Sequence, residues 1–77
     1  RRRFLLENGR ITDGTIIDVK TDENGQELVV FVYTLNGVDF ESADALTFEQ
    51  KQRAGDYVPG AKVGIRFDPK NQYNSIV

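Results

Sequence analysis

The sequence predicts an all-β fold, built as one small antiparallel domain. Residues 26–35 form the only continuous run of β-branched and aromatic residues in the 77-residue chain, and such residues favour strands. Asn24-Gly25 before the run and Asn36-Gly37 after it are strong hairpin signals. Residues 61–67 alternate between apolar and polar side chains, which is typical of a half-buried strand. We therefore expect residues 26–35 to be the central strand of the sheet.

Three further strands complete the prediction. Residues 15–20 follow an Asp-Gly turn signal, residues 38–42 follow the second Asn-Gly turn, and residues 73–77 close the chain. Five short antiparallel strands joined by tight turns indicate a small barrel or sandwich, in the size range of SH3-like and OB-like folds.

Two short helical segments are also predicted. Residues 1–9 end in Asn8-Gly9, a helix stop because glycine accepts the left-handed conformation; a frayed terminus is the alternative. Thr47 to Gln50 fits a capping box. We divide the chain into a basic and apolar N-terminal segment, residues 1–9, which we place close to a membrane, and a single antiparallel β domain, residues 10–77.

The core face of residues 26–35 depends on the two turns. A two-residue Asn24-Gly25 loop would bury the even-numbered side chains, whereas a two-residue Asn36-Gly37 loop would bury the odd-numbered ones. One turn must therefore be longer, or a bulge must intervene. In residues 15–20 we expect the apolar face to hold three residues, Thr15, Ile17 and Val19.

The face of residues 26–35 that is not core is also apolar. It is Phe31, Tyr33 and Leu35 if the even residues are core, and Leu28, Val30 and Val32 if the odd residues are core. Either the N-terminal group Phe4, Leu5 and Leu6 covers it, or it is an interface for a partner.

Composition excludes several kinds of chemistry. The chain has no His, Cys, Met or Trp, so it lacks the usual zinc and haem ligands, a thiol nucleophile and the common near-neutral acid or base. Ser42 and Ser75 have no His partner for a nucleophilic pair. We predict no catalytic residue, no metal site and no cofactor.

Charge is unevenly distributed. The formal net charge is −2, but without Arg1, Arg2 and Arg3 the chain keeps 7 basic and 12 acidic residues. An acidic body opposes nucleic-acid binding, which usually relies on a basic face. The arginine run fits the cytoplasmic flank of a preceding membrane helix; a solvated charge run is the alternative. Because the chain does not begin with Met, we expect it to be a piece of a longer protein.

Three segments resemble a known family. They are Gly9-Arg10-Ile11-Thr12-Asp13-Gly14-Thr15-Ile16-Ile17-Asp18-Val19, the strand that ends in Asn36-Gly37, and the stretch Tyr57-Val58-Pro59-Gly60-Ala61-Lys62-Val63-Gly64-Ile65-Arg66-Phe67-Asp68-Pro69-Lys70-Asn71. Together they resemble the bacterial domain of unknown function 3592, although Gln72-Tyr73 stands where members often have a proline. The resemblance implies a soluble β module beside membrane-spanning helices, with no known catalytic residues, and it favours the even-numbered face as core.

Three other groups suggest chemistry without a complete pattern for it. The acidic turn of residues 22–27 offers oxygen donors for calcium but lacks EF-hand spacing. Asp39, Glu41 and Asp44 could supply a carboxylate pair, which would need an apolar pocket. A stacking platform for single-stranded nucleic acid could come from Phe31, Tyr33, Phe40 and Tyr57, with Lys62 and Arg66 as the basic groove.

The function we expect is that of a non-enzymatic soluble β module in a membrane-anchored bacterial protein, serving interaction or scaffolding, with the cytoplasmic face favoured. Phe31, Tyr33 and Leu35 are the predicted interaction surface, and Arg1, Arg2 and Arg3 the predicted membrane-proximal group. The expected partners are flanking transmembrane segments and an unknown protein; neither nucleic acid nor a small-molecule substrate is expected. The alternative function is an OB-like module that binds single-stranded nucleic acid.

Overall fold

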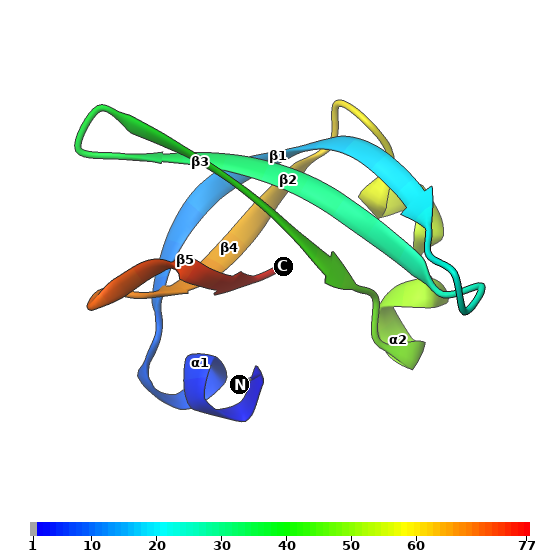
Figure 1. The fold of residues 1–77 in the computed structure, drawn as a ribbon, viewed down its shortest axis with the longest axis horizontal. Helices are drawn as coiled ribbons and strands as arrows, with labels where there is room; N and C mark the ends of the chain where they lie inside the picture. The colour runs from blue at the N-terminus through cyan, green and yellow to red at the C-terminus, as the bar shows by residue number, and fades with distance from the viewer. Residues whose placement is uncertain (1) are drawn as a thin grey trace.

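The computed structural model describes residues 2–77 as a five-stranded antiparallel sheet that curls into a nearly closed barrel (Figure 1). The predicted all-β class, the five strands and the short N-terminal helix are confirmed. In chain order, the elements are α1 (Arg2–Asn8), β1 (Arg10–Thr21), β2 (Glu27–Leu35), β3 (Val38–Ala45), α2 (Phe48–Lys51), the 3-10 helix η1 (Ala54–Tyr57), β4 (Lys62–Asp68) and β5 (Asn71–Ile76).

The strand order is β3-β2-β1-β4-β5, so β1 occupies the middle of the sheet. This corrects the expectation that residues 26–35, which correspond to β2, are central. β1 is 12 residues long and begins at Arg10, five residues earlier than predicted. Because of the extra length, residues 10–15 of β1 pair with β4, and residues 14–21 pair with β2.

The turns select the odd-numbered face of β2 as core. Leu35 pairs with Val38 and Tyr33 with Phe40, so the β2–β3 loop has two residues, Asn36-Gly37. Both loop residues have positive φ, 52° and 80°, as a type I′ turn requires. At the opposite end, the Asp22 amide donates to the Gln26 carbonyl over 2.9 Å, which leaves a three-residue turn. The preference for the even face was therefore wrong.

A β-bulge in β1 completes the register. Ile16 pairs with Phe31 and Asp18 with Val30, so Ile17 is the extra residue. Ile16 is fully buried, whereas Ile17 is 43% exposed. The expectation that Thr15, Ile17 and Val19 form the apolar face is thus wrong. Before the bulge, the side chain that reaches the core is that of Ile16, an even-numbered residue. Bulges of this kind bend a strand and increase its twist, which suits a barrel.

The core lies inside the barrel and is rich in aromatic rings. The Tyr33 ring stacks against Phe40 and Phe67, with ring centroids 5.4 and 6.3 Å apart. Gly14 makes this packing fit, since a Cβ there would lie 2.6 Å from Ile65 Cγ1 and 2.8 Å from the Val32 carbonyl oxygen. The buried cluster comprises Ile16, Val29, Phe31, Tyr33, Phe40, Leu46, Ile65 and Phe67.

Side chains close the barrel between its two edge strands. Within residues 2–77, β3 and β5 lie close together but share no hydrogen-bonded ladder. From β2, the Tyr33 hydroxyl reaches β5, where it hydrogen-bonds to the Gln72 carbonyl oxygen and lies 3.0 Å from Ser75 Oγ. The Phe40 and Tyr73 rings meet edge to face at 4.8 Å. We call this junction the β3–β5 seam.

The two helices close the ends of the structure. α1 contacts β4 and β5, and its Leu5 is fully buried. The predicted capping box of α2 is confirmed: Thr47 Oγ1 accepts from the Gln50 amide over 3.2 Å, and Gln50 Oε1 accepts from the Thr47 amide over 2.8 Å. Gln50 Nε2 also donates to the Val77 carbonyl over 3.0 Å, which ties α2 to the end of β5.

Candidate functional site

The predicted interaction surface does not lie at the surface. Phe31 is fully buried and Tyr33 is 3% exposed, both within the core cluster. Leu35 is half-buried and packs against that cluster. The prediction was wrong because it assumed that the even-numbered residues of β2 face inward.

The opposite face of β2 is the open apolar one. We call Leu28, Val30 and Val32 the outer strip. Leu28 and Val32 are partly exposed, while Val30 is only 6% exposed. Of the two alternatives for the face that is not core, cover by the N-terminal apolar group is wrong, since the main contacts of α1 are with β4 and β5.

Carboxylates frame the outer strip. On β3, Glu41 pairs with Val32 and Asp39 with Thr34; on β1, Asp18 pairs with Val30. Because paired residues in an antiparallel sheet lie on the same face, these three acidic residues border the strip. Thr34 Oγ1 donates to Asp39 Oδ1 over 2.6 Å. The face therefore combines an apolar centre with a border that is acidic beside Val30, Val32 and Thr34 and basic beside Leu28, where Lys20 pairs.

A groove continues this face across β1. It has a volume of about 680 Å³, and residues 12–15 of β1 lie between Val32 to Thr34 on one side and Lys62 on the other. Lys62 Nζ donates to Thr15 Oγ1 over 3.0 Å, so its charge is held at the groove wall. Three threonines supply most of the polar lining of the groove, with Asp13 as its acidic residue and Lys62 as its basic one.

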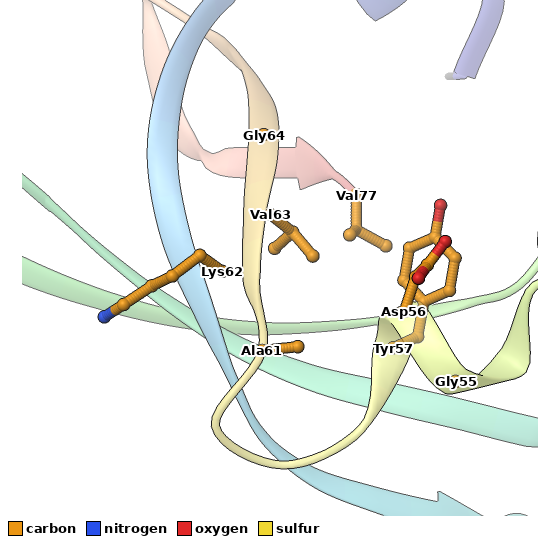
Figure 2. Close-up of a pocket in the computed structure, with 8 residues that line it drawn as sticks. All are labelled: Gly55, Asp56, Tyr57, Ala61, Lys62, Val63, Gly64 and Val77. Atoms are coloured by element: carbon orange, nitrogen blue, oxygen red, sulfur yellow. The ribbon is translucent and has the colours of Figure 1, made fainter.

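A second hollow, of about 460 Å³, lies between η1 and β4 (Figure 2). Figure 2 shows Ala61, Val63, Val77 and the Tyr57 ring around this space, whereas the Lys62 side chain points away from it. Asp56 is the acidic residue of its lining. One carboxylate beside apolar groups does not supply the acid and base pair that general acid–base catalysis uses.

The acidic turn of residues 22–27 uses its first carboxylate to build the hairpin. Asp22 Oδ1 accepts from the Asn24 amide over 2.9 Å and from the Gln26 amide over 2.8 Å. Among residues 2–77, no three Asp or Glu side chains come together in a group that could hold a metal ion. The structure thus gives Asp22 a role in the turn.

The predicted carboxylate group lies along β3. Asp39 and Glu41 are exposed on its outer face, and Asp44 lies 3.8 Å from Arg2 Nη1. The predicted stacking platform is not a surface, because Phe31, Tyr33 and Phe40 are buried and only Tyr57 is half-buried. That correction has the same cause as the first, the inward orientation of the odd-numbered face.

The N-terminal arginines are used differently from one another. Arg1 lies outside the described residues. Arg2 donates to the Val77 carbonyl over 3.5 Å and faces Asp44, whereas Arg3 pairs with Glu7 on the helix surface at 3.2 Å. Neither α1 nor α2 has the length and apolarity of a membrane-spanning helix, a finding that concerns residues 2–77.

Sequence reasoning gave the outer strip only as the alternative exposed face, and it missed Ile17 as an exposed neighbour. The available signal was the pair of adjacent β-branched residues at Ile16 and Ile17, which breaks the alternation expected of a regular strand. Such a break is what a bulge produces.

Comparison with known proteins adds no relative. No family model matches the chain, and neither a curated protein nor a solved structure is similar to it. The resemblance to the domain of unknown function 3592 therefore stays a prediction.

Proposed function

We propose that this chain is a non-enzymatic interaction module of a membrane-anchored bacterial protein, and that the outer strip with its acidic border is the surface that binds a protein partner. The observation that carries the proposal is the composition of this face. Leu28 and Val32 reach solvent, and three of the residues paired with β2 on this face are acidic: Asp18, Asp39 and Glu41. Lys20, which pairs with Leu28, is the basic residue of the border. A partner segment that pairs apolar side chains with Lys or Arg would complement it.

The topology supports an OB-like assignment within the small barrels. β1, β2 and β3 form a meander, and β4 then returns beside β1, which is a Greek key. OB folds are five-stranded Greek-key barrels that use the face of strands 2 and 3 for binding. The outer strip lies on the corresponding face of this barrel.

The same topology is also compatible with the alternative function, binding of single-stranded nucleic acid. Single-stranded nucleic acid is bound by exposed rings and a basic groove. On this face the described side chains around Val32 are Glu41, Thr15 and Thr34, and the rings of β2 point inward. We therefore rank a protein partner above an oligonucleotide.

The membrane setting of the proposal rests on the arginine run and on the family resemblance. A spanning segment next to residue 1 would place α1 close to the bilayer and leave the outer strip free for a partner. The cytoplasmic side is favoured, because basic residues accumulate on that side of spanning helices.

Peptide selection with the purified chain tests the proposal. We expect a random displayed library to yield peptides that alternate apolar residues with Lys or Arg. Glu41→Lys should weaken their binding about tenfold, because close interfacial charge pairs contribute roughly 1.5 kcal/mol or more. Glu49→Lys on α2 is the matched control and should leave binding unchanged.

Two results would count against the proposed surface. One is the absence of any enriched peptide; the other is equal weakening by Glu41→Lys and Glu49→Lys. Labelled single-stranded DNA is measured in parallel at low and moderate salt. Binding that falls steeply with salt would favour the nucleic-acid alternative.

A further inference from the structure

We infer that α1 and the adjoining outer face of β1 and β4 form a docking face for an anionic membrane surface. We call Arg3, Phe4, Leu6, Ile11, Arg66 and Lys70 the α1 face. This inference deepens the proposed function, on which its membrane setting rests, by naming the part of the folded module that meets lipid.

Charge is segregated between two parts of the described chain. Residues 2–11 and 66–77 carry five basic and two acidic residues, whereas residues 12–65 carry four basic and ten acidic residues. The first part contains α1, the start of β1, the end of β4 and β5. Near an anionic bilayer, this distribution attracts the α1 end and repels the remainder.

The fold gathers the first part on one side of the sheet. Ile11 pairs with Arg66, and Arg66 pairs with Ile76, so these three side chains share one face. Phe67 and Ser75, their neighbours along the strands, are buried on the other face. Ile76 is nonetheless only 2% exposed, because α1 packs over β4 and β5. Ile11 and Arg66 therefore lie beside the helix.

The helix presents apolar side chains on both flanks. Leu5 points into the protein and is fully buried, while Phe4 and Leu6 are 48% and 47% exposed. Phe4 lies in a hollow with Pro69 and Lys70 of the β4–β5 turn. Ile11, at 63% exposure, extends the apolar surface onto β1. Apolar and aromatic groups among cations are typical of segments that settle at the membrane interface.

Carboxylates reduce the positive charge of this face without cancelling it, and the exposed Asp13, two residues after Ile11 on the same face of β1, lies at its border. Glu7 is paired with Arg3 at 3.2 Å, and Asp68 Oδ1 accepts from the Lys70 amide over 2.9 Å. No ion pair within residues 2–77 engages Arg66 or Lys70, so both charges are available to lipid phosphates. Exposed apolar groups beside them favour a bilayer over a nucleic acid, which offers phosphates without an apolar phase.

Vesicle binding by the purified chain tests the inference. We expect binding to vesicles of phosphatidylcholine and phosphatidylserine at low salt, none to pure phosphatidylcholine, and release at high salt because exposed charges are screened. Arg66→Gln and Lys70→Gln should each weaken binding about fivefold, the effect of one cation near an anionic surface. Lys20→Gln and Lys51→Gln remove matched charges from the acidic part and should have little effect.

A second pair of variants tests the apolar contribution. Ile11→Ser should weaken vesicle binding severalfold, whereas Val38→Ser, a residue of similar exposure at 53% on the β2–β3 tip, should not. Circular dichroism confirms that each variant is folded. Neither residue belongs to the core cluster, so both variants should pass this control.

Three outcomes would overturn the inference: no binding to anionic vesicles, equal binding to both kinds of vesicle, or equal losses in the test and control variants. Capture of single-stranded DNA by Arg66 and Lys70 in place of vesicles would also overturn it. Peptide binding at the outer strip is measured independently, so a failure here is distinguishable from a failure of the proposed function.

Discussion

The two faces of β2 are nearly equal in apolar character and very different in burial. On one face Val29 and Phe31 are 0% exposed and Tyr33 is 3% exposed. On the other, Leu28 and Val32 reach solvent. The total hydrophobicity of each face does not determine which one is buried. The two-residue turn at Asn36-Gly37 and the bulge at Ile17 determine it. In a strand that is apolar on both sides, turn geometry fixes the core.

The largest effect that tests this comparison comes from placing a charge on each face. Phe31→Asp should leave the chain unfolded, because an unpaired carboxylate in the core adds to the loss of a ring worth about 3–5 kcal/mol. Val32→Asp should remain folded, since its side chain already reaches water. Circular dichroism and urea denaturation distinguish the two. Equal unfolding would show that both faces are buried.

A methyl group added under the core should have the next largest effect. Gly14→Ala should lower the free energy of unfolding by about 2–3 kcal/mol, the upper part of the usual overpacking range, because its Cβ would meet the Val32 backbone oxygen. Gly64→Ala on β4 is the control, since nothing lies within 4 Å of a Cβ there. Urea denaturation gives both values, and similar losses would contradict the close approach.

Removing one hydroxyl tests how the inner face is tied to β5. Tyr33→Phe should lower the free energy of unfolding by about 1–2 kcal/mol, because it removes the hydrogen bonds from the Tyr33 hydroxyl of β2 to Gln72 and Ser75 of β5. Tyr73→Phe is the matched change at a ring that is 65% exposed and should cost less than about 0.5 kcal/mol. Thermal unfolding compares them. A neutral Tyr33→Phe would show that the seam does not depend on this contact.

The smallest effect concerns the turn that selects the face. Asn36→Ala should cost about 1 kcal/mol, because alanine tolerates the positive φ of 52° less well than asparagine. Asn24→Ala lies in the other turn, where Gly25 carries the positive φ, and should cost less. Both are measured by urea denaturation. If Asn24→Ala cost more, the assigned roles of the turns would be reversed.

Much of the fold could be predicted because its signals are local. The strand runs, the Asn36-Gly37 turn, the Asn8-Gly9 helix stop and the Thr47 capping box each depend on residues a few positions apart. The early start of β1 was missed because Asp13-Gly14 reads as a turn, whereas Gly14 is a strand residue at a tight contact.

The candidate surface was harder to predict because it depends on long-range register. Ile16 and Ile17 are chemically alike, so the sequence does not show which of them faces Phe31. If Ile17 is wrongly paired with the core face, the exposed group is predicted to be Phe31 and Tyr33, whereas it is Leu28 and Val32. The contacts of α1 with β4 and β5 bring the two ends of the described chain together. The pattern of apolar residues within either end does not predict these contacts.

The β3–β5 seam also bears on how the barrel comes apart. β5 shares backbone hydrogen bonds with β4, while its other edge is tied to the rest by ring contacts and a few polar side chains. Detaching this last strand sacrifices far less than separating β1 from its two ladders. We expect local opening to start there, so that β5 amide protons exchange with deuterium sooner than those of β1.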